Sequence, residues 1–322
     1  MRGALVETMG GTVRIAARRA VVLACGGFPH DLERRQALFP HAADGTGHWS
    51  PAPEGNTGDG IRLGESVGAR VDTSLPNAAA WVPISRVPRP DGSHGVFPHF
   101  VDRAKPGVIA VTQAGRRFVN EANSYHDFIQ ALLAAVPPGA AIKAFLLADH
   151  RTIRKYGLGF VKPFPLPLRP HLRSGYLVRG RTLSELAEKA GIDAGALAGT
   201  VEAYNRDAWE GRDTAFAKGS TAYNRSLGDP DHRPHPCIAP LEQPPFYAVE
   251  VVVGDLGTFA GLETDRFARV LDEAGTPIAG LYAVGNDMAS IMGGNYPGGG
   301  ITLGPAMTFG WIAARHIAGV AD

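Results

Sequence analysis

The sequence has few of the features that mark exported, metal-bound or nucleic-acid-binding proteins. Cys25 and Cys237 are its only cysteines, too few for a disulfide framework or a structural zinc site. Lys and Arg number 32 against 31 Asp and Glu, so the net charge of +1 offers no field for polyanions. No apolar run approaches the ~20 residues of a membrane span. We therefore expect a cytoplasmic protein with no nucleic-acid partner, no membrane span and no bound metal.

The residues that are present predict two domains in a chain of 322 residues that is 44% hydrophobic. Near the start, "ALVET" and "TVRIAARRAVVLACGGF" read as strands, and the apolar run Ala20 to Ala24 predicts a strand buried on both faces of a sheet. The stretch "NTGDGIRLGESVGARV" predicts a helix that is entered at Gly58 and Gly60 and ends near Gly68. Residues 1–80 are thus assigned to a first domain.

The composition of the sequence changes after residue 80. Prolines and histidines become frequent, and helical periodicity appears with start signals at Thr182 and Asp193. We assign residues 81–250 to an inserted domain. Residues 251–322 return to strands and turns, end a buried strand at "GLYAVG" and so complete the first domain.

The stretch "GGNYPGGGITLGPAMTFG", from Gly293 to Gly310, places glycines before and inside a predicted helix. The first N–H groups of a helix lack internal partners and attract an anion or an electron-rich carbonyl. Glycine lets a ligand sit directly on backbone, although Gly298 to Gly300 could also form a simple tight turn. A second glycine pair at a strand end, in "LACGG", favours a large ligand that bridges both segments.

Six segments in order resemble one family: "RRAVVLACGGF", "NTGDGIRLGESVGARV", "GRRFVNE", "GTFAGLETD", "ARVLDEAGTPIAGLYAVGN" and "MGGNYPGGGITLGPAMTFG". They resemble the FAD-dependent oxidoreductases of the fumarate reductase and succinate dehydrogenase flavoprotein superfamily, and most closely the 3-ketosteroid Δ1-dehydrogenases. The resemblance covers nearly the whole chain. It implies an α/β (α+β) fold, with a Rossmann-like FAD-binding domain and an inserted α+β substrate or capping domain.

One element of the family pattern is missing. Its members begin with a βαβ unit that carries a GxGxxG loop for the FAD pyrophosphate, and no such loop follows a strand near the amino terminus here. The FAD-binding domain is therefore expected to be incomplete. A sheet without its central strand exposes apolar surface and unpaired backbone, so we expect either the missing half on another chain or self-association.

The resemblance also implies which residues contact FAD. The backbone of the "LACGG" segment would approach the dinucleotide, and Cys25 there is interpreted as a small packed residue rather than a nucleophile. The helix start would face flavin N1 and O2 and stabilise the charge of the reduced flavin. The implied cofactor-binding residues are Ala24, Cys25, Gly26, Gly27, Gly285, Asn286, Gly299, Gly300, Ile301, Thr302 and Leu303.

The implied reaction is 1,2-desaturation of a 3-ketosteroid or a similar bulky cyclic ketone. Tyr296 lies four residues before Gly300, the spacing with which the related dehydrogenases bind the substrate carbonyl between a tyrosine hydroxyl and a glycine N–H. Tyr125 would take the proton. Its phenol needs help at neutral pH, and His126 is a possible substitute for the family's helper, although a structural role is the commoner one for such a histidine. The electron acceptor is left open.

Other interpretations remain. Reduction of a dicarboxylate such as fumarate would need arginine clamps, and residues 122–128 contain no arginine. The chain could also be a non-catalytic fragment or one subunit of a split flavoenzyme. Arg116 and Arg117 point to opposite faces of a strand, which predicts one solvated charge and one ion-pair partner of Glu121. The loop at residues 229–236 carries two histidines and two aspartates, and its prolines favour a surface loop over a metal site.

Overall fold

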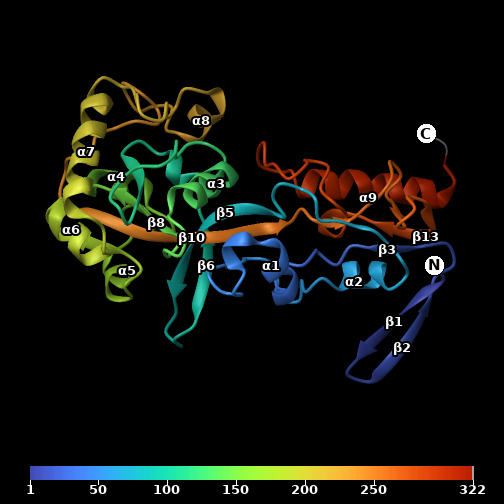
Figure 1. The fold of residues 1–322 in the computed structure, drawn as a ribbon. Coiled ribbons are helices and arrows are strands. Elements are labelled where there is room, and N and C mark those ends of the chain that lie inside the picture. Colours follow the sequence, from blue (N-terminus) through green and yellow to red (C-terminus); the bar gives the residue numbers. More distant parts are fainter. Residues whose placement is uncertain (321–322) are drawn as a thin grey trace. The chain divides into compact units, whose positions relative to one another are not determined.

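The computed structural model describes residues 1–320, which form two compact units. Unit 1 consists of residues 1–46, residues 52–80 and the chain from 255 onwards, and unit 2 consists of residues 47–51 and 81–254. Unit 1 is thus built from both ends of the chain and unit 2 from its middle (Figure 1). Helices and strands mix in both, as the predicted fold class requires. No helix within residues 1–320 has both the length and the hydropathy needed to cross a membrane.

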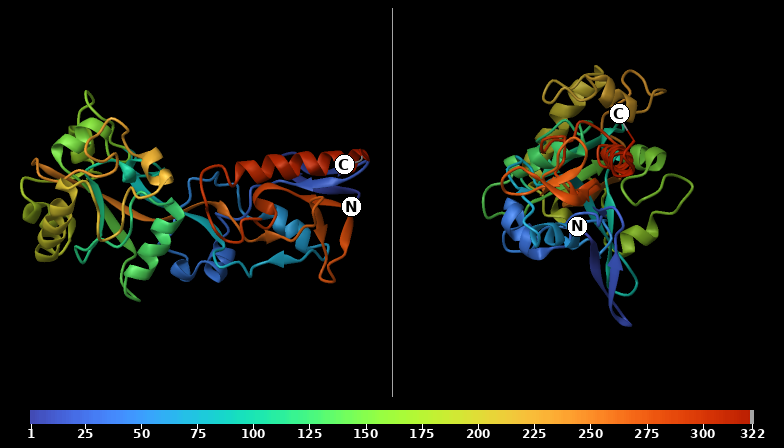
Figure 2. Two further views of the ribbon diagram at one scale, coloured as in Figure 1. Left: turned by 90° about the horizontal axis from the view of Figure 1, so that it is seen from above. Right: turned by 90° about the vertical axis from the view of Figure 1, so that its right-hand side faces the viewer.

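Unit 1 is organised on a three-stranded sheet. Strand β13 (Pro277–Ala283) pairs antiparallel with β12 (Arg269–Leu271) and parallel with β3 (Val21–Leu23). Helix α9 (Leu303–Ala318) runs along this sheet (Figure 2), where its buried Ala313 packs against Tyr282 and Val284. The remaining elements are hairpin β1 (Gly3–Thr8) and β2 (Gly11–Ala16), ladder β4 (Val71–Asp72) with β11 (Gly261–Leu262), helices α1 (Leu32–Leu38) and α2 (Asp59–Glu65), and 3-10 turns Pro40–Ala42 and Gly285–Asp287.

Gly58 and Gly60, at the start of α2, are required for different reasons. Gly58, the residue before the helix, has a φ of +85°, which favours glycine. Gly60 lies so close to Asp287 that a Cβ there would stand 2.1 Å from the carboxylate oxygen Oδ2. The predicted helix between Gly58 and Gly68 is therefore confirmed, and it ends at Glu65.

The prediction that the Ala20 to Ala24 strand is buried on both faces is wrong. Val22 is 43% exposed while Leu23, which points to the opposite face, is buried, so one face of β3 is left uncovered by the described residues. Strand β3 is also the edge of its sheet, with no neighbour on its outer side among the described residues. Helix α9 is also largely uncovered: Leu303, Met307 and Trp311, spaced by four residues, are 65%, 66% and 62% exposed. Residues at that spacing share one face of a helix, so unit 1 presents an apolar stripe and an open strand edge.

Unit 2 contains a sheet of order β6-β5-β10-β8-β7, with β9 also paired to β10. Helices α6 and α7 cover one face, and Leu186, Leu197 and Val201 pack there against Ile109 and Phe145 of the sheet. The strands are β5 (Ala79–Pro88), β6 (His94–Pro98), β7 (Val108–Thr112), β8 (Lys143–Ala148), β9 (Val178–Gly180) and β10 (Phe246–Thr258); β5 and β10 begin or end in unit 1. The helices are the 3-10 turn Asp102–Ala104, α3 (Tyr125–Ala135), α4 (His150–Tyr156), α5 (Arg169–Arg173), α6 (Leu183–Ala190), α7 (Ala194–Trp209) and α8 (Ala222–Leu227).

Both helix starts predicted for the insert are confirmed. The hydroxyl of Thr182 accepts a hydrogen bond from the Glu185 amide at 3.1 Å, and the Asp193 carboxylate accepts one from the Ala196 amide at 2.8 Å. Such caps satisfy amides that the first helical turn leaves without partners. The sequence therefore located α6 and α7 through their capping residues.

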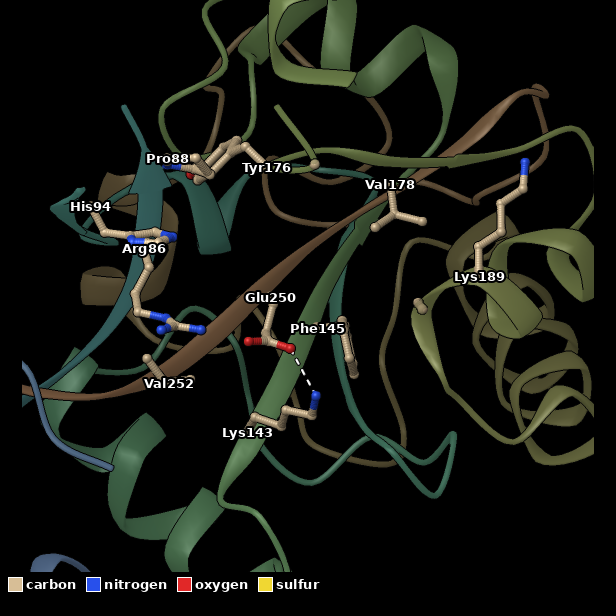
Figure 3. A pocket seen from close by; sticks show the side chains of 12 residues that line it. Arg86, Pro88, His94, Lys143, Phe145, Tyr176, Val178, Lys189, Glu250 and Val252 are labelled. Atoms are coloured by element: carbon tan, nitrogen blue, oxygen red, sulfur yellow. Dashed lines mark hydrogen bonds and ion pairs between the residues drawn. The ribbon is translucent and has the colours of Figure 1, made fainter. Parts of the chain in front are cut away.

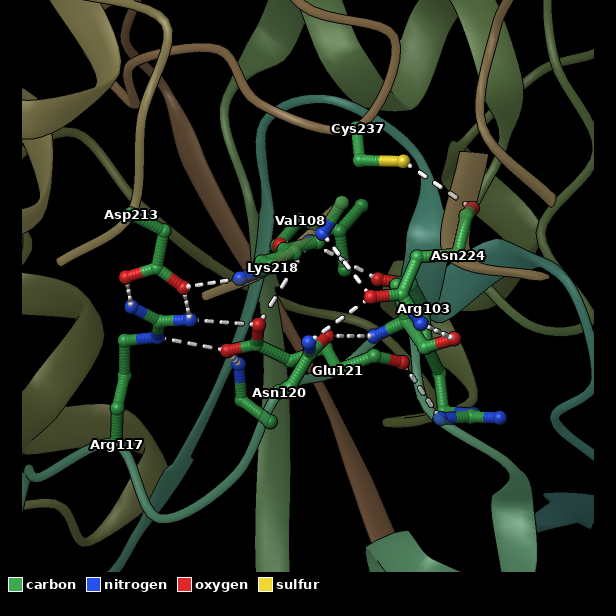
Figure 4. A network of polar contacts seen from close by, with 12 residues as sticks. Arg103, Val108, Arg117, Asn120, Glu121, Asp213, Lys218, Asn224 and Cys237 are labelled. Carbon is green, nitrogen blue, oxygen red and sulfur yellow. Dashed lines mark hydrogen bonds and ion pairs between the residues drawn. The ribbon is translucent and has the colours of Figure 1, made fainter. Parts of the chain in front are cut away.

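A buried charged network holds unit 2 together (Figure 4). Arg117 makes bidentate contacts with Glu121 at 2.8 Å and with Asp213 at 2.8 and 2.9 Å, while Arg116 is exposed. The predicted division of roles between the two arginines is confirmed. Burial alone would raise the pKa of Glu121, but Arg117 and Lys218 hold it below its ordinary value.

The same network ties a distant loop to the sheet. The fully buried Lys218 donates to the carbonyls of Arg103 and Val108 at 3.1 and 2.5 Å, and its ammonium lies 3.7 Å from Glu121. The two carboxylates and two cations of the cluster, Glu121 and Asp213 with Arg117 and Lys218, balance in charge. Buried charges persist only when they are paired and hydrogen-bonded in this way.

The loop at residues 229–236 is held by hydrogen bonds and an ion pair with its neighbours. Asp229 accepts from Lys155 at 2.8 Å and from the Tyr156 hydroxyl at 2.6 Å, and the His232 ring contacts the His235 carbonyl at 2.9 Å. Across residues 1–320, no group of three or more His, Cys, Asp or Glu side chains is arranged to hold a metal ion.

Candidate functional site

A pocket of about 470 Å³ in unit 1 brings together segments far apart in the sequence. The end of β3, the turn after β13 and the first turns of α9 meet there. Six of the eleven predicted cofactor-binding residues line it: Ala24, Gly26, Gly285, Asn286, Thr302 and Leu303; the other lining residues are Val284, Ala306 and Met307. Its wall is thus mostly small side chains and backbone, which leaves room for a flat ligand.

Asp287 was not among the residues predicted from the sequence. It holds together two turns that line this pocket. Its buried carboxylate accepts hydrogen bonds from the amides of Cys25 at 2.5 Å and Gly27 at 2.9 Å. Burial raises the pKa of Asp287, although both amide donors oppose that shift. The carboxylate therefore fastens the "LACGG" turn to the "GND" turn, and its position directly after Asn286 in a matched segment was the available signal.

Cys25 differs from its prediction. We expected a small packed residue, but the Cys25 side chain is exposed, as is the neighbouring Ala24, although Gly27 in the same turn is buried. Partial burial and the neighbouring Asp287 raise the pKa of its thiol. A raised pKa keeps the thiol protonated at neutral pH, so the other half of the expectation, that Cys25 is no activated nucleophile, agrees with its surroundings.

The glycine-rich segment leaves its backbone open. A Cβ on Gly298, Gly299 or Gly300 would meet no atom within 4 Å, and Gly300 has a φ of +97° that favours glycine. Helix α9 begins at Leu303 after Thr302, with no side-chain cap. The Gly304 amide already donates to the Gly300 carbonyl at 2.7 Å and Pro305 has no N–H, so the first turn of this 16-residue helix leaves the Leu303 amide and the positive end of the dipole at this point. Ile301 is buried and anchors the turn.

Tyr296 is buried in unit 1, and its ring centroid lies 6.4 Å from that of Phe259. It stands in the same loop as Gly300 and just before α9. The Phe259 amide in turn donates to the Ala78 carbonyl at 2.7 Å, which fixes the wall against which Tyr296 packs. The Tyr296 ring therefore packs against a wall that a backbone hydrogen bond holds in place.

Tyr125 belongs to unit 2, where it is the first residue of α3. Ser124 caps this helix by accepting from the Asp127 amide at 3.3 Å, and the Tyr125 ring lies 5.3 Å from Phe100. His126 is buried, and its Nδ1 accepts from the Trp81 amide at 3.0 Å, which ties α3 to β5. That bond agrees with a structural role for His126.

Arg103, also missed by the sequence analysis, holds the loop before α3. Its guanidinium is fully buried and donates to the carbonyls of Glu121 at 2.6 Å and Asn123 at 3.2 Å, as well as to that of Phe100 at 3.3 Å. Arg103 therefore fixes both the turn that leads into Tyr125 and the backbone of Phe100, whose ring packs on Tyr125.

Comparison with known proteins gives a consistent result. The family model described as "FAD binding domain" matches residues 1–303. The chain is 42% identical to the 4-oxocyclohex-2-ene-1-carboxylate 5-dehydrogenase of Sinomonas cyclohexanicum over 309 residues, 96% of this chain and 52% of that protein. It is 40% identical to a 3-oxosteroid 1-dehydrogenase of Mycobacterium tuberculosis over 310 residues, 94% of this chain and 53% of that protein.

The structure agrees with these relatives. It superposes with a TM-score of 0.90 and 41% identity on 3-ketosteroid Δ1-dehydrogenase from Sterolibacterium denitrificans, solved in complex with 1,4-androstadiene-3,17-dione, over 99% of this chain and 57% of that one. The chain thus spans about half the length of the curated relatives it matches. It belongs to the FAD-dependent oxidoreductases of the fumarate reductase and succinate dehydrogenase flavoprotein superfamily, among the relatives of the 3-ketosteroid Δ1-dehydrogenases, and its cofactor is FAD.

Proposed function

We propose that this chain forms the flavin-side and substrate-side parts of an enzyme that desaturates the bond next to the carbonyl of a cyclic ketone, with 3-ketosteroids as the main candidate. The observation that carries the proposal is the pocket of about 470 Å³ in which matched but distant segments converge. Relatives that share these segments are named for 3-oxosteroids and for 4-oxocyclohexene carboxylate.

The residues of this pocket suit FAD. Its lining of glycine, alanine and small polar side chains admits a planar ring, and the open backbone at Gly300 and the amides at the start of α9 suit an electron-rich edge. We assign Thr302 and Leu303 to the flavin end, and Gly285 and Asn286 to the chain that links the flavin to the phosphates. When bound, FAD supplies the oxidant that accepts a hydride from the substrate.

The protein's own groups would activate the ketone. The Tyr296 hydroxyl and the Gly300 amide donate to the carbonyl oxygen, which stabilises the enolate that forms when a neighbouring C–H bond is broken. Tyr125 takes that proton, while the hydride leaves the next ring carbon, so the substrate loses one proton and one hydride and gains a double bond. Arg103 acts on Tyr125 only by holding the backbone before α3.

Reduction of a dicarboxylate is the weaker alternative. Binding two carboxylates requires guanidinium groups at the site. Residues 122–128 and the loop 293–302 contain none, and the guanidinium of Arg103, which holds the backbone before α3, is fully buried and donates to backbone carbonyls.

The open face of unit 1 suggests a completing polypeptide. We propose that the outer edge of β3 and the part of α9 beyond the flavin pocket, where Trp311 is exposed, receive a β-strand and a helix that bring the phosphate-binding loop. An unpaired parallel strand edge beside an exposed apolar helix face is the surface that such a βαβ segment covers. Self-association through the same face is the alternative.

The test is flavin retention. The chain is co-expressed with the segment of the Sinomonas dehydrogenase that it does not match, incubated with FAD and desalted, and its visible absorption is recorded. We expect about one FAD per chain, bleached by a 3-ketosteroid without oxygen. Thr302→Trp, which fills the pocket, should weaken FAD binding at least tenfold, while Thr308→Trp on the exposed side of the same helix should not.

Each failure has a separate meaning. Equal FAD binding by Thr302→Trp would reject the pocket as the flavin site. Retained FAD that 4-oxocyclohexanecarboxylate bleaches and a 3-ketosteroid does not would reject steroids as the substrate class. A complex that holds no FAD at all would favour the interpretation that the chain is a non-catalytic fragment.

A further inference from the structure

A second pocket, of about 400 Å³, lies wholly within unit 2 and contains none of the residues assigned to flavin or ketone (Figure 3). It lies on the same face of the sheet against which α6 and α7 pack. Strands β5, β6, β8, β9 and β10 and the end of α6 contribute to it. The lining residues are Arg86, Pro88, His94, Lys143, Phe145, Gly175, Tyr176, Val178, Lys189, Ala190, Glu250 and Val252.

The charges in this pocket are unequal. Arg86, Lys143 and Lys189 supply three cations against the single carboxylate of Glu250. Lys143 pairs with Glu250 at 2.9 Å, and Lys189 pairs outside the pocket with Glu185 at 2.7 Å. Two cations are therefore already compensated by carboxylates.

Arg86 is the exception. Its guanidinium carbon lies 5.1 Å from the centre of the Trp49 ring, and it makes no hydrogen bond or ion pair with any of residues 1–320. Stacking on an aromatic ring orients the planar guanidinium without using its N–H donors. Figure 3 shows Arg86 facing the same space as Glu250 and Val252. The pocket thus contains one oriented guanidinium, that of Arg86, whose N–H donors have no acceptor among residues 1–320.

The remaining wall is apolar and one side of it is rigid. Phe145, Val178 and Val252 line the space beside the cations. The Tyr176 hydroxyl lies 2.6 Å from Ser85 Oγ, which in turn lies 2.9 Å from His99 Nε2. His99 Nδ1 contacts Asp102 at 2.6 Å.

This chain of bonds resembles a nucleophile with its base and acid, but Ser85 is only 1% exposed. In the neutral tautomer of His99 whose Nδ1 donates to Asp102, Nε2 accepts from Ser85, and Ser85 in turn accepts from Tyr176. Burial raises the pKa of Tyr176 to about 12, so the phenol remains a neutral donor. The series therefore fixes the orientation of the Tyr176 ring instead of presenting a nucleophile.

We propose that this pocket binds a small organic carboxylate with an apolar ring or short alkyl body, whose carboxylate pairs with Arg86 and whose body packs on Phe145, Val178 and Val252. A single free guanidinium matches a planar carboxylate by two parallel hydrogen bonds. The volume lies in the range of small-molecule sites, and the apolar wall favours a ligand with a hydrophobic part over an inorganic anion. The site lies outside the predicted reaction centre.

The test uses cyclohexanecarboxylate and its neutral amide as matched probes. Binding to the purified chain, without FAD or substrate, is followed by ligand-observed NMR titration at low salt. We expect saturable binding of the acid in the millimolar range, weaker binding of the amide, and weakening of the acid as salt rises. Arg86→Gln should weaken the acid by about tenfold, since a charge-assisted pair is lost.

Two further variants locate the effect. Glu250→Gln removes the competing carboxylate and should tighten binding of the acid a few-fold. Arg89→Gln makes the same change of charge on the same hairpin outside the pocket lining and should leave binding unchanged. Equal binding of acid and amide, unchanged binding by Arg86→Gln, or no saturable binding by the folded chain would each overturn the proposal. None of these results depends on flavin binding, so the proposed reaction can fail or succeed separately.

Discussion

Replacing Glu121 by glutamine is expected to lower the free energy of unfolding by about 3–5 kcal/mol, because the change leaves buried cations without their carboxylate. Glu121 is fully buried and contacts Arg117, Lys218 and the amide of Ala110. The amide of glutamine would place an N–H group against the guanidinium. Urea unfolding at pH 7, read by circular dichroism, measures the effect.

A matched change tests whether burial is the cause. Glu202 pairs with Arg206 at 2.8 Å on the exposed side of α7, and Glu202→Gln is expected to cost no more than about 0.5 kcal/mol, as exposed helix pairs do. A similar small loss for Glu121→Gln would mean that water or a local shift replaces the lost contacts. Similar large losses for both variants would mean that burial is not the cause of the loss.

The lowered pKa values of Glu121 and Asp213 predict that the network loses stability in acid. Burial opposes ionisation of Glu121 and Asp213, but their cations hold both pKa values below the ordinary range. Native carboxylates of this kind contribute stability that is present above the unfolded pKa of about 4 and is lost as pH falls through the lower native values. The urea midpoint of the protein should therefore fall steadily below about pH 4, and fall less steeply in Glu121→Gln.

Tyr296→Phe is expected to slow reduction of bound flavin by a 3-ketosteroid by about 10² to 10³, the usual loss when a donor to a developing oxyanion is removed. Substrate binding should change much less, because the donor acts mainly in the transition state. Stopped-flow absorbance of the FAD-loaded assembly separates the two quantities. This prediction depends on the proposed function.

Tyr282→Phe is the matched control. Tyr282 is also a buried tyrosine of unit 1, and its hydroxyl lies 2.7 Å from His316 Nδ1. Its loss should lower stability and leave flavin reduction unchanged. Equal slowing in both variants would mean that unit 1 responds to any loss of a buried hydroxyl, and an unchanged rate in Tyr296→Phe would remove this residue from the mechanism.

The elements that the sequence predicted are those whose signal is local. Thr182 and Asp193 mark helix starts because the capping bond involves residues three apart. The pairing of Arg117 with Glu121 was predicted from strand alternation, but residues 113–121 form no strand and Arg117 makes only an isolated bridge with Val111, so the short separation is what carried the prediction. Convergence of the glycine segments was inferred from their shared glycine pattern and from the family resemblance, because no local signal links segments that lie hundreds of residues apart.

The residues that were missed depend on distant partners. Asp287 bonds amides about 260 residues away, and Arg103 and Lys218 bind carbonyls that no periodicity reveals. The exposure of Val22 and Cys25 was mispredicted for a related reason. Composition shows that a strand is apolar, but whether a neighbour covers it is a property of the sheet.

Asp287 also limits what the turn after β3 can hold. The amides of Cys25 and Gly27 both point at its carboxylate, so the donors that a glycine turn would offer to a phosphate are already used. Any ligand group that reaches this turn meets the Asp287 carboxyl group and carbonyl oxygens such as that of Gly26, to which the Asn56 amide donates at 3.3 Å. We therefore expect the turn to favour hydroxyl and amino groups over anions.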